Sequence, residues 1–121
     1  MKTIEKPKFD GTPFIGNKSN VERATVIKTR YGLALKVESK VLTTLDNGVE
    51  IRASKLMGFG EDEENGLYII KESKLDKFLE SKGVNSESIP EDITEGTTVI
   101  ELLDKPVTVQ MDSKTNFLDL I

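Results

Sequence analysis

Residues 23–43 have the sequence RATVIKTRYGLALKVESKVLT, in which apolar and polar side chains alternate at a period of two. In the second half of this stretch the leucines and valines fall on one face, while Lys36 and its charged neighbours fall on the other. The alternation predicts half-buried strands over residues 23–29 and 33–43. Tyr31-Gly32 supplies a turn between them, so the first two strands form a hairpin.

Further elements follow from local signals along the chain. Asn47-Gly48 readily takes the positive φ angles of a tight hairpin turn. Ser73 and Asp76 are spaced to cap the start of a short helix, and Gly83 is typical of its end. The other expected strands are residues 49–57, 97–103 and 107–111, with a short final strand over 117–121.

The resulting element order, β-β-β-α-β-β, is that of an oligonucleotide/oligosaccharide-binding (OB) barrel. The predicted fold class is therefore all-β with one short helix, arranged as a five-stranded OB-type barrel. A length of 121 residues corresponds to one domain. We assign residues 21–121 to the barrel and residues 1–20, which contain Pro and Gly but few apolar anchors, to an extended N-terminal arm.

The composition excludes several classes of chemistry. The chain has no cysteine and no histidine, which removes thiol catalysis, zinc–cysteine sites and the commonest general base. The acidic run Glu61 to Glu64 lacks the ligand spacing of a calcium loop. We therefore expect no catalytic residues, no metal and no cofactor. No apolar run has membrane-spanning length and the start lacks a signal-peptide core, so we expect a cytoplasmic protein, in a cell or a virus-infected cell, with no membrane partner.

Charge is distributed unevenly between the two halves of the chain. Residues 1–60 contain 11 Lys and Arg against 6 Asp and Glu, whereas residues 61–121 contain 6 against 15. This asymmetry is compatible with a nucleic-acid-binding face backed by a repelling one, and equally with charges that only solvate a surface. Proteins that bind single strands combine a basic groove with aromatic stacking platforms. The candidate nucleic-acid-binding residues are Lys28, Arg30, Tyr31, Lys36, Lys40, Arg52, Lys55, Phe59, Tyr68 and Lys105.

Each candidate has two interpretations. Tyr31 either stacks on a base or covers one end of the barrel. Phe59, between two glycines, either clamps a base or anchors its loop in the core, and Tyr68 is either a stacking residue or a buried strand tyrosine. Lys36 and Arg52 alternate with inward apolar residues, so both are expected to face solvent, in a phosphate-contacting stripe or in an ordinary charged exterior.

Three segments carry a resemblance to a known family. They are residues 29–37 (TRYGLALKV), 73–79 (SKLDKFL) and 103–109 (LDKPVTV). On these segments the chain resembles the small OB-fold single-stranded-DNA-binding proteins of archaea, phages and plasmids. The resemblance implies a replication or repair accessory that coats exposed single-stranded DNA, or RNA in its place, with little sequence preference.

Two rival hypotheses remain open at this point. The first is a protein-interaction module, such as a virion or replisome subunit, whose apolar C-terminal strand adds to a partner's sheet. The second is an enzyme subunit whose catalytic partner is another chain. The first rests on the acidic second half of the sequence and on the apolar C-terminal strand.

Overall fold

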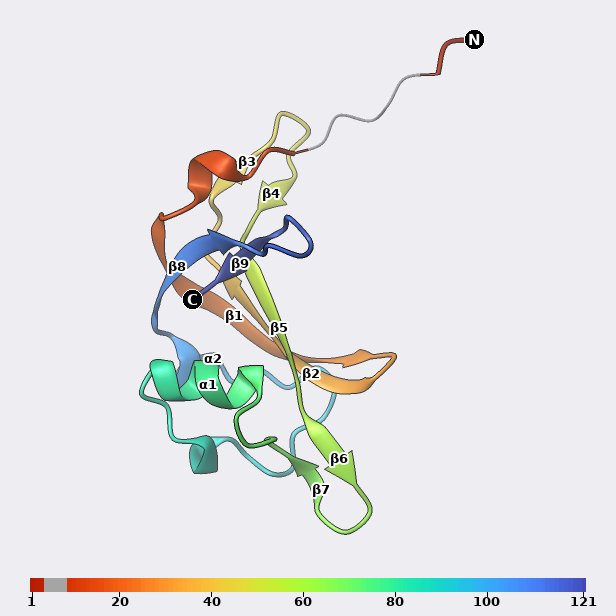
Figure 1. Cartoon of the computed structure of the whole chain (residues 1–121), viewed down its shortest axis with the longest axis vertical. Helices are drawn as coiled ribbons and strands as arrows, with labels where there is room; N and C mark the ends of the chain where they lie inside the picture. The colour runs from red at the N-terminus through yellow and green to blue at the C-terminus, as the bar shows by residue number, and fades with distance from the viewer. Residues whose placement is uncertain (4–8) are drawn as a thin grey trace.

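The computed structural model describes residues 1–3 and 9–121 (Figure 1). Residues 4–8 of the expected N-terminal arm lie outside the described residues. The rest of that arm is partly ordered: η1 (Thr12–Phe14) is a 3₁₀ turn, and the first strand already begins at Lys18. The expected boundary at residue 21 is therefore three residues late for the start of the sheet.

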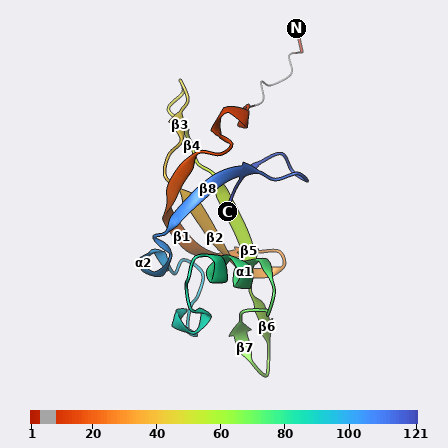
Figure 2. The same cartoon turned by 60° about the vertical axis from the view of Figure 1, so that its left-hand side comes forward.

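A five-stranded antiparallel sheet is the main element of the structure, as the alternation predicts. The strands lie side by side in the order β5-β2-β1-β8-β9 (Figures 1 and 2). They are β1 (Lys18–Thr29), β2 (Gly32–Ser39), β5 (Ser54–Gly58), β8 (Pro106–Met111) and β9 (Leu118–Leu120).

Strand β1 is at the centre of this sheet because it has neighbours on both edges. On one edge it pairs with β2, from Thr29 opposite Gly32 to Val21 opposite Ser39, with a bulge between Val21 and Arg23. On the other edge its first residues pair with β8, and Thr25 forms a bridge with Thr98. The bulge locally increases the bend and twist of this long strand.

The expected third strand is interrupted. It divides into β4 (Glu50–Ile51), which pairs with β3 (Thr43–Thr44), and β5, which pairs with β2. The Asn47-Gly48 turn lies in the β3–β4 hairpin, and Gly48 has the positive φ of +85° that this turn requires. Residues 60–68 form a second small hairpin, β6 (Gly60–Asp62) with β7 (Gly66–Tyr68).

Helix α1 (Lys74–Ser81) begins where the capping signal predicts. The Ser73 hydroxyl accepts a hydrogen bond from the Asp76 amide, and Asp76 Oδ2 accepts one from the Glu72 amide. Gly83, with φ of +69°, follows the helix end in the left-handed conformation. A second 3₁₀ turn, η2 (Ser86–Ser88), follows it.

The strand expected over residues 97–103 is wrong. Only its start is extended, where Thr98 bridges to β1, and Ile100–Leu103 forms the short helix α2. Val99 and Leu103 are both buried, and their spacing of four residues places them on one helical face. The fourth and fifth strands of the sheet are therefore β8 and β9, one element later than expected.

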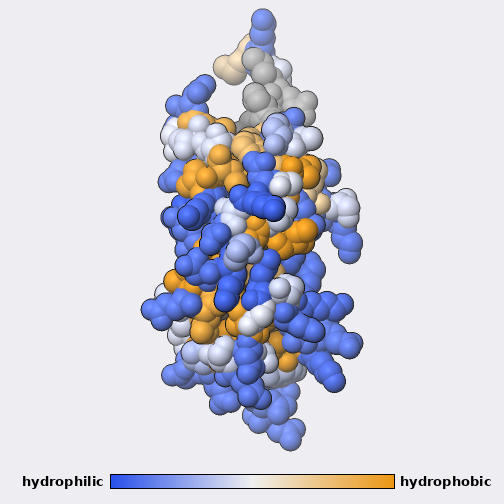
Figure 3. Space-filling view, turned by 90° about the vertical axis from the view of Figure 1, so that its left-hand side faces the viewer, coloured by the Kyte–Doolittle hydropathy of each residue, from blue (hydrophilic) through white to orange (hydrophobic). Residues whose placement is uncertain are grey.

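The core lies between the sheet and α1. Its least exposed side chains include Val26, Leu35 and Val37 from β1 and β2, and Leu79 from α1, each at 1% exposure or less. Apolar side chains on the face nearest β8 and α2 are separated by hydrophilic ones, as Figure 3 shows. The large exposed apolar residues lie instead in turns and strand edges.

The two edge strands of the sheet, β5 and β9, meet through side chains. The Lys55 ammonium lies 3.2 Å from Asp119 Oδ2 and donates to the Leu120 carbonyl at 3.1 Å. Over residues 1–3 and 9–121, β5 and β9 have no backbone ladder between them, so the sheet is curled but not closed by hydrogen bonds. The five-stranded sheet is thus confirmed at the level of strand content, without a closed barrel.

We expect Lys55→Met to lower the free energy of unfolding by about 2 kcal/mol, because Asp119 would remain mostly buried with only Gln110 as a side-chain donor. Urea unfolding at neutral pH measures the change. The matched control is Lys77→Met on the exposed face of α1, which should stay within about 0.5 kcal/mol of the parent protein. Equal decreases in the two variants would show that the β5–β9 contact contributes nothing specific.

Candidate nucleic-acid interface

The β1–β2 turn presents an arginine and a tyrosine to solvent. Thr29 stabilises the turn, because its hydroxyl donates to the Gly32 carbonyl at 2.8 Å and accepts from the Tyr31 amide at 3.1 Å. Tyr31 is 89% exposed, so it does not cover the end of the sheet. The Arg30 guanidinium carbon lies 5.6 Å from the centroid of the Tyr31 ring, which is within the range of a cation–π interaction.

Beside this turn, the outer face of β2 carries the expected cation. Lys36 is paired with Thr25 on β1 and with Leu56 on β5, so these three residues form one row across the sheet. Lys36 is half-buried and Leu56 is 49% exposed. Lys28 is exposed and lies opposite Leu33, close to the turn.

The β8–β9 loop is a part of this surface that sequence reasoning missed. The Asp112 carboxylate accepts hydrogen bonds from the amides of Lys114, at 2.8 Å, and Thr115, at 3.3 Å. Asn116 adopts a positive φ of 60°, and Phe117 is left 74% exposed. In both views the β8–β9 loop and the β1–β2 turn project to the same side of the molecule (Figures 1 and 2).

The β8–β9 loop is absent from the sequence prediction because that prediction places the fourth strand at residues 97–103. With strands expected over residues 97–103 and 107–111, Lys105 falls between strands four and five. In the structure Lys105 lies between α2 and β8, half-buried, with its amide bonded to the Leu103 carbonyl. The true loop between the last two strands carries Lys114 and Phe117.

Lys40 does not join this surface. It follows the last residue of β2, at the end of that strand opposite the Arg30-Tyr31 turn, and its amide donates to the Asn20 carbonyl. Its side chain is exposed beside a shallow depression that is also lined by Lys18, Val41 and Pro106. The structure therefore separates Lys40 from Arg30 by the length of the hairpin.

Arg52 and Lys55 are held in ion pairs rather than exposed as a stripe. The Arg52 guanidinium contacts Glu22 Oε2 at 2.6 Å and donates to the Ser39 carbonyl at 2.9 Å, so only 11% of its side chain is exposed. The expectation that Arg52 faces solvent is wrong. Lys55 lies opposite Val37, on the core side of β5, and the alternation that places Ala53 and Met57 inward predicts this position.

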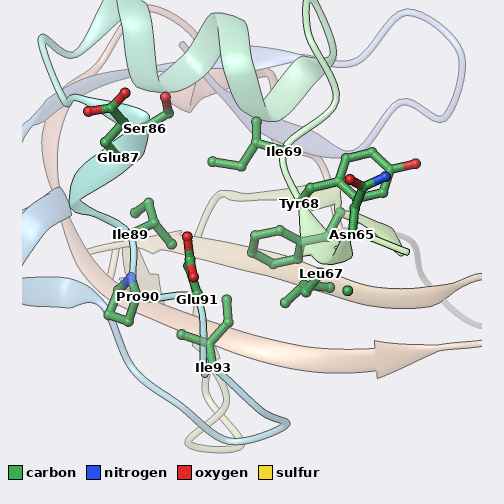
Figure 4. A pocket seen from close by; sticks show the side chains of 12 residues that line it. Asn65, Leu67, Tyr68, Ile69, Ser86, Glu87, Ile89, Pro90, Glu91 and Ile93 are labelled. Atoms are coloured by element: carbon green, nitrogen blue, oxygen red, sulfur yellow. The ribbon is translucent and has the colours of Figure 1, made fainter. Parts of the chain in front are cut away.

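Phe59 and Tyr68 lie in and beside the β6–β7 hairpin, next to the start of β2, where the Phe59 amide donates to the Leu33 carbonyl at 3.0 Å. Phe59 is half-buried against the core, which is the loop-anchor interpretation. Tyr68 is 38% exposed, and its ring covers Gly60, where a Cβ atom would collide with it. Both line a groove near the β6–β7 hairpin (Figure 4) whose rim includes Glu87 and Glu91. Carboxylates repel phosphate, so the groove side of these aromatics is an unfavourable position for a nucleic acid.

No known family, curated protein or solved structure matches this chain. Over the described part of the chain, every helix is too short or too polar to cross a bilayer. The same described residues contain no group of three or more acidic side chains placed to hold a metal ion. The chemistry of the surface itself is therefore what indicates a function.

The hydrogen bonds to Asp112 have a consequence in acid. They hold the pKa of its carboxyl below the ordinary value of 3.8, so the stabilisation from these bonds is fully present above pH 3.8 and disappears as pH falls through the lower folded-state pKa. We expect the amide proton shifts of Lys114 and Thr115 to titrate together with a midpoint below 3.8. Two-dimensional NMR over a pH series from neutral to strongly acidic measures that midpoint.

The control is Asp112→Ala, in which this titration should disappear and the loop amides should exchange faster. A midpoint at or above 3.8 in the parent protein would mean that the carboxylate does not order the loop in solution.

Proposed function

We propose that this chain is an OB-type barrel that binds single-stranded DNA with little sequence preference, as a non-catalytic accessory of replication or repair. The observation that carries the proposal is the Arg30–Tyr31 pair, exposed at the tip of the β1–β2 turn on the same side as Phe117 of the β8–β9 loop. Exposed aromatic rings beside cations are the common chemistry of single-strand binding.

The strand arrangement supports the OB assignment. An OB fold is a partly open five-stranded Greek-key barrel, and its ligands lie on the face of strands two and three between the loops that join strands one–two and four–five. Here those strands are β2 and β5, and those loops carry Tyr31 and Phe117. Closure of such a barrel requires one further pairing, β5 with β9, which the described residues do not form; Lys55 joins these two edges through its side chain only.

The chemistry of the surface fits a single strand better than a duplex. Tyr31 and Phe117 offer two separate rings on which unpaired bases can stack, and such stacking is available only when bases are free of a helix. Arg30 lies against the first ring, Lys28 is exposed close to the turn, and Lys36 lies farther along β2 on the opposite face of the hairpin from Lys28; these cations are available to neutralise phosphates. Stacking and phosphate neutralisation do not read the edges of the bases, so the proposal predicts little sequence preference.

The rival proposal, docking of a protein through the C-terminal strand, has less support. Strand β9 pairs with β8, and its carbonyl at Leu120 accepts from Lys55 of β5. Leu120 is fully buried, and Thr108 and Ile121 exchange two backbone hydrogen bonds. This strand is therefore paired along its β8 edge only, and on its other edge the contacts of Lys55 with Asp119 and Leu120 occupy part of the space that a partner strand needs.

Arg30→Ala combined with Lys36→Ala is expected to weaken binding of a fluorescein-labelled oligo-dT and to flatten its salt dependence. The log–log slope should decrease by about 0.7 for each phosphate that the variant no longer neutralises. Fluorescence anisotropy at several salt concentrations measures both quantities. The charge-matched control, Lys71→Ala with Lys77→Ala near the acidic groove, should leave the slope unchanged. Equal slopes in the parent and the Arg30/Lys36 variant would reject this surface.

The two rings give a separate test that does not involve charge. Tyr31→Ala and Phe117→Ala should each weaken oligo-dT binding about tenfold, because each removes one stacking platform. Tyr31→Phe and Phe117→Tyr keep the rings and should bind as the parent does. All four variants should retain the parental urea midpoint, because both side chains are mostly exposed. Weaker binding in the Tyr31 series alone would restrict the interface to the β1–β2 turn.

A further inference from the structure

A groove of about 970 Å³ opens between two segments that are distant in sequence (Figure 4). One wall is residues 65–69, which include β7, and the other is residues 86–93, which follow α1. The groove lies at the end of the molecule that carries the β6–β7 hairpin, whereas the β8–β9 loop lies toward the other end (Figure 1). The groove is thus distant from the β8–β9 loop, and it adjoins the β1–β2 turn through Phe59, whose amide donates to the Leu33 carbonyl.

Apolar side chains form one part of the lining of the groove, among polar ones. Leu67, Ile69 and Ile89 are half-buried and pack against the core, and Ile93 is 7% exposed. Because these side chains are fixed by the core on one side and accessible from the groove on the other, they form a preformed apolar surface. An apolar side chain from a ligand gains burial there without any rearrangement of the protein.

The charges around the groove have a single sign. Glu87 and Glu91 line it, and its lining residues include no lysine or arginine. The turn of the adjacent β6–β7 hairpin carries four consecutive acids, Glu61 to Glu64. The field of these carboxylates attracts cations and repels phosphate, which makes a nucleic acid an unsuitable occupant.

The groove also exposes a strand edge. Within the described residues β7 pairs only with β6, so its second edge has amide and carbonyl groups without a strand partner. All five residues from Asn65 to Ile69 line the groove. Since successive side chains of a strand point to opposite faces, a groove that touches every residue must run along the edge.

We propose that this groove binds an extended basic segment of a partner protein, which adds to β7 as a third strand. Main-chain hydrogen bonds to β7 hold the segment, an apolar side chain enters between Leu67, Ile69 and Ile89, and Lys or Arg side chains face Glu87 and Glu91. This mode, addition of a strand to an exposed edge with side-chain pockets for specificity, is common in peptide recognition. The proposal is independent of DNA binding, because it uses none of the residues of that surface.

The test uses the full chain and a fluorescein-labelled peptide, Lys-Leu-Lys-Ile-Lys-Leu-Lys, with the same sequence carrying Glu for Lys as the control peptide. The basic peptide should bind, the acidic one should not, and amide shifts in a ¹⁵N spectrum should change along residues 65–69 and 86–93. Glu87→Gln with Glu91→Gln should weaken binding about tenfold, since two ion pairs are removed. Both side chains are exposed, so this variant should fold as the parent does.

The matched control is Glu61→Gln with Glu63→Gln, which removes the same charge from the hairpin turn without touching the groove. Equal weakening in the two double variants would overturn the proposal, because it would reduce binding to general attraction between opposite charges. Shifts confined to other residues would also overturn it. Concentration-dependent shifts of the groove amides without peptide would assign the groove to a second copy of this chain instead.

Discussion

The structure depends on the pairing of β1 along both of its edges. Its side chains Val21, Ala24 and Val26 are buried in the core, and the amides and carbonyls of these buried positions need partners. Strand β2 supplies partners on one edge, and β8 together with residues 97–99 supplies them on the other. Both the β1–β2 turn and the first residues of β8 are positioned by this single strand.

The sequence predicts those elements of the fold that have one buried face and one solvent-exposed face. The alternation through residues 23–39 predicts β1 and β2, and the Ser73–Asp76 cap predicts α1, because each signal is local and the tertiary contacts agree with it. The exposure of Tyr31 was left open by the sequence, since the same turn residue suits a covering role and a stacking role.

The wrong predictions have a common physical cause: the local alternation of apolar and polar residues does not specify which strand or side chain a segment pairs with. Residues 97–103 are apolar enough for a strand, but only Thr97 to Val99 find a neighbour in β1, and the chain then closes into a helical turn that buries Leu103. Arg52 has the outward parity of a strand residue. The break between β4 and β5 instead directs it to Glu22 and Ser39, which lie thirty and thirteen residues away in sequence.

The two proposed surfaces follow from the uneven distribution of charge along the chain, because the fold places the basic segment and the acidic segment in different elements. Residues 18–40 carry six Lys and Arg against two Glu and form the central hairpin, whereas residues 59–95 carry eleven Asp and Glu against four Lys and build the groove end. A phosphate backbone is attracted to the first region and repelled by the second, and a basic peptide has the opposite preference. On the two proposals, opposite charges assign the single strand and the basic partner to different regions, and the hydrogen bond from Phe59 to Leu33 marks where these regions adjoin.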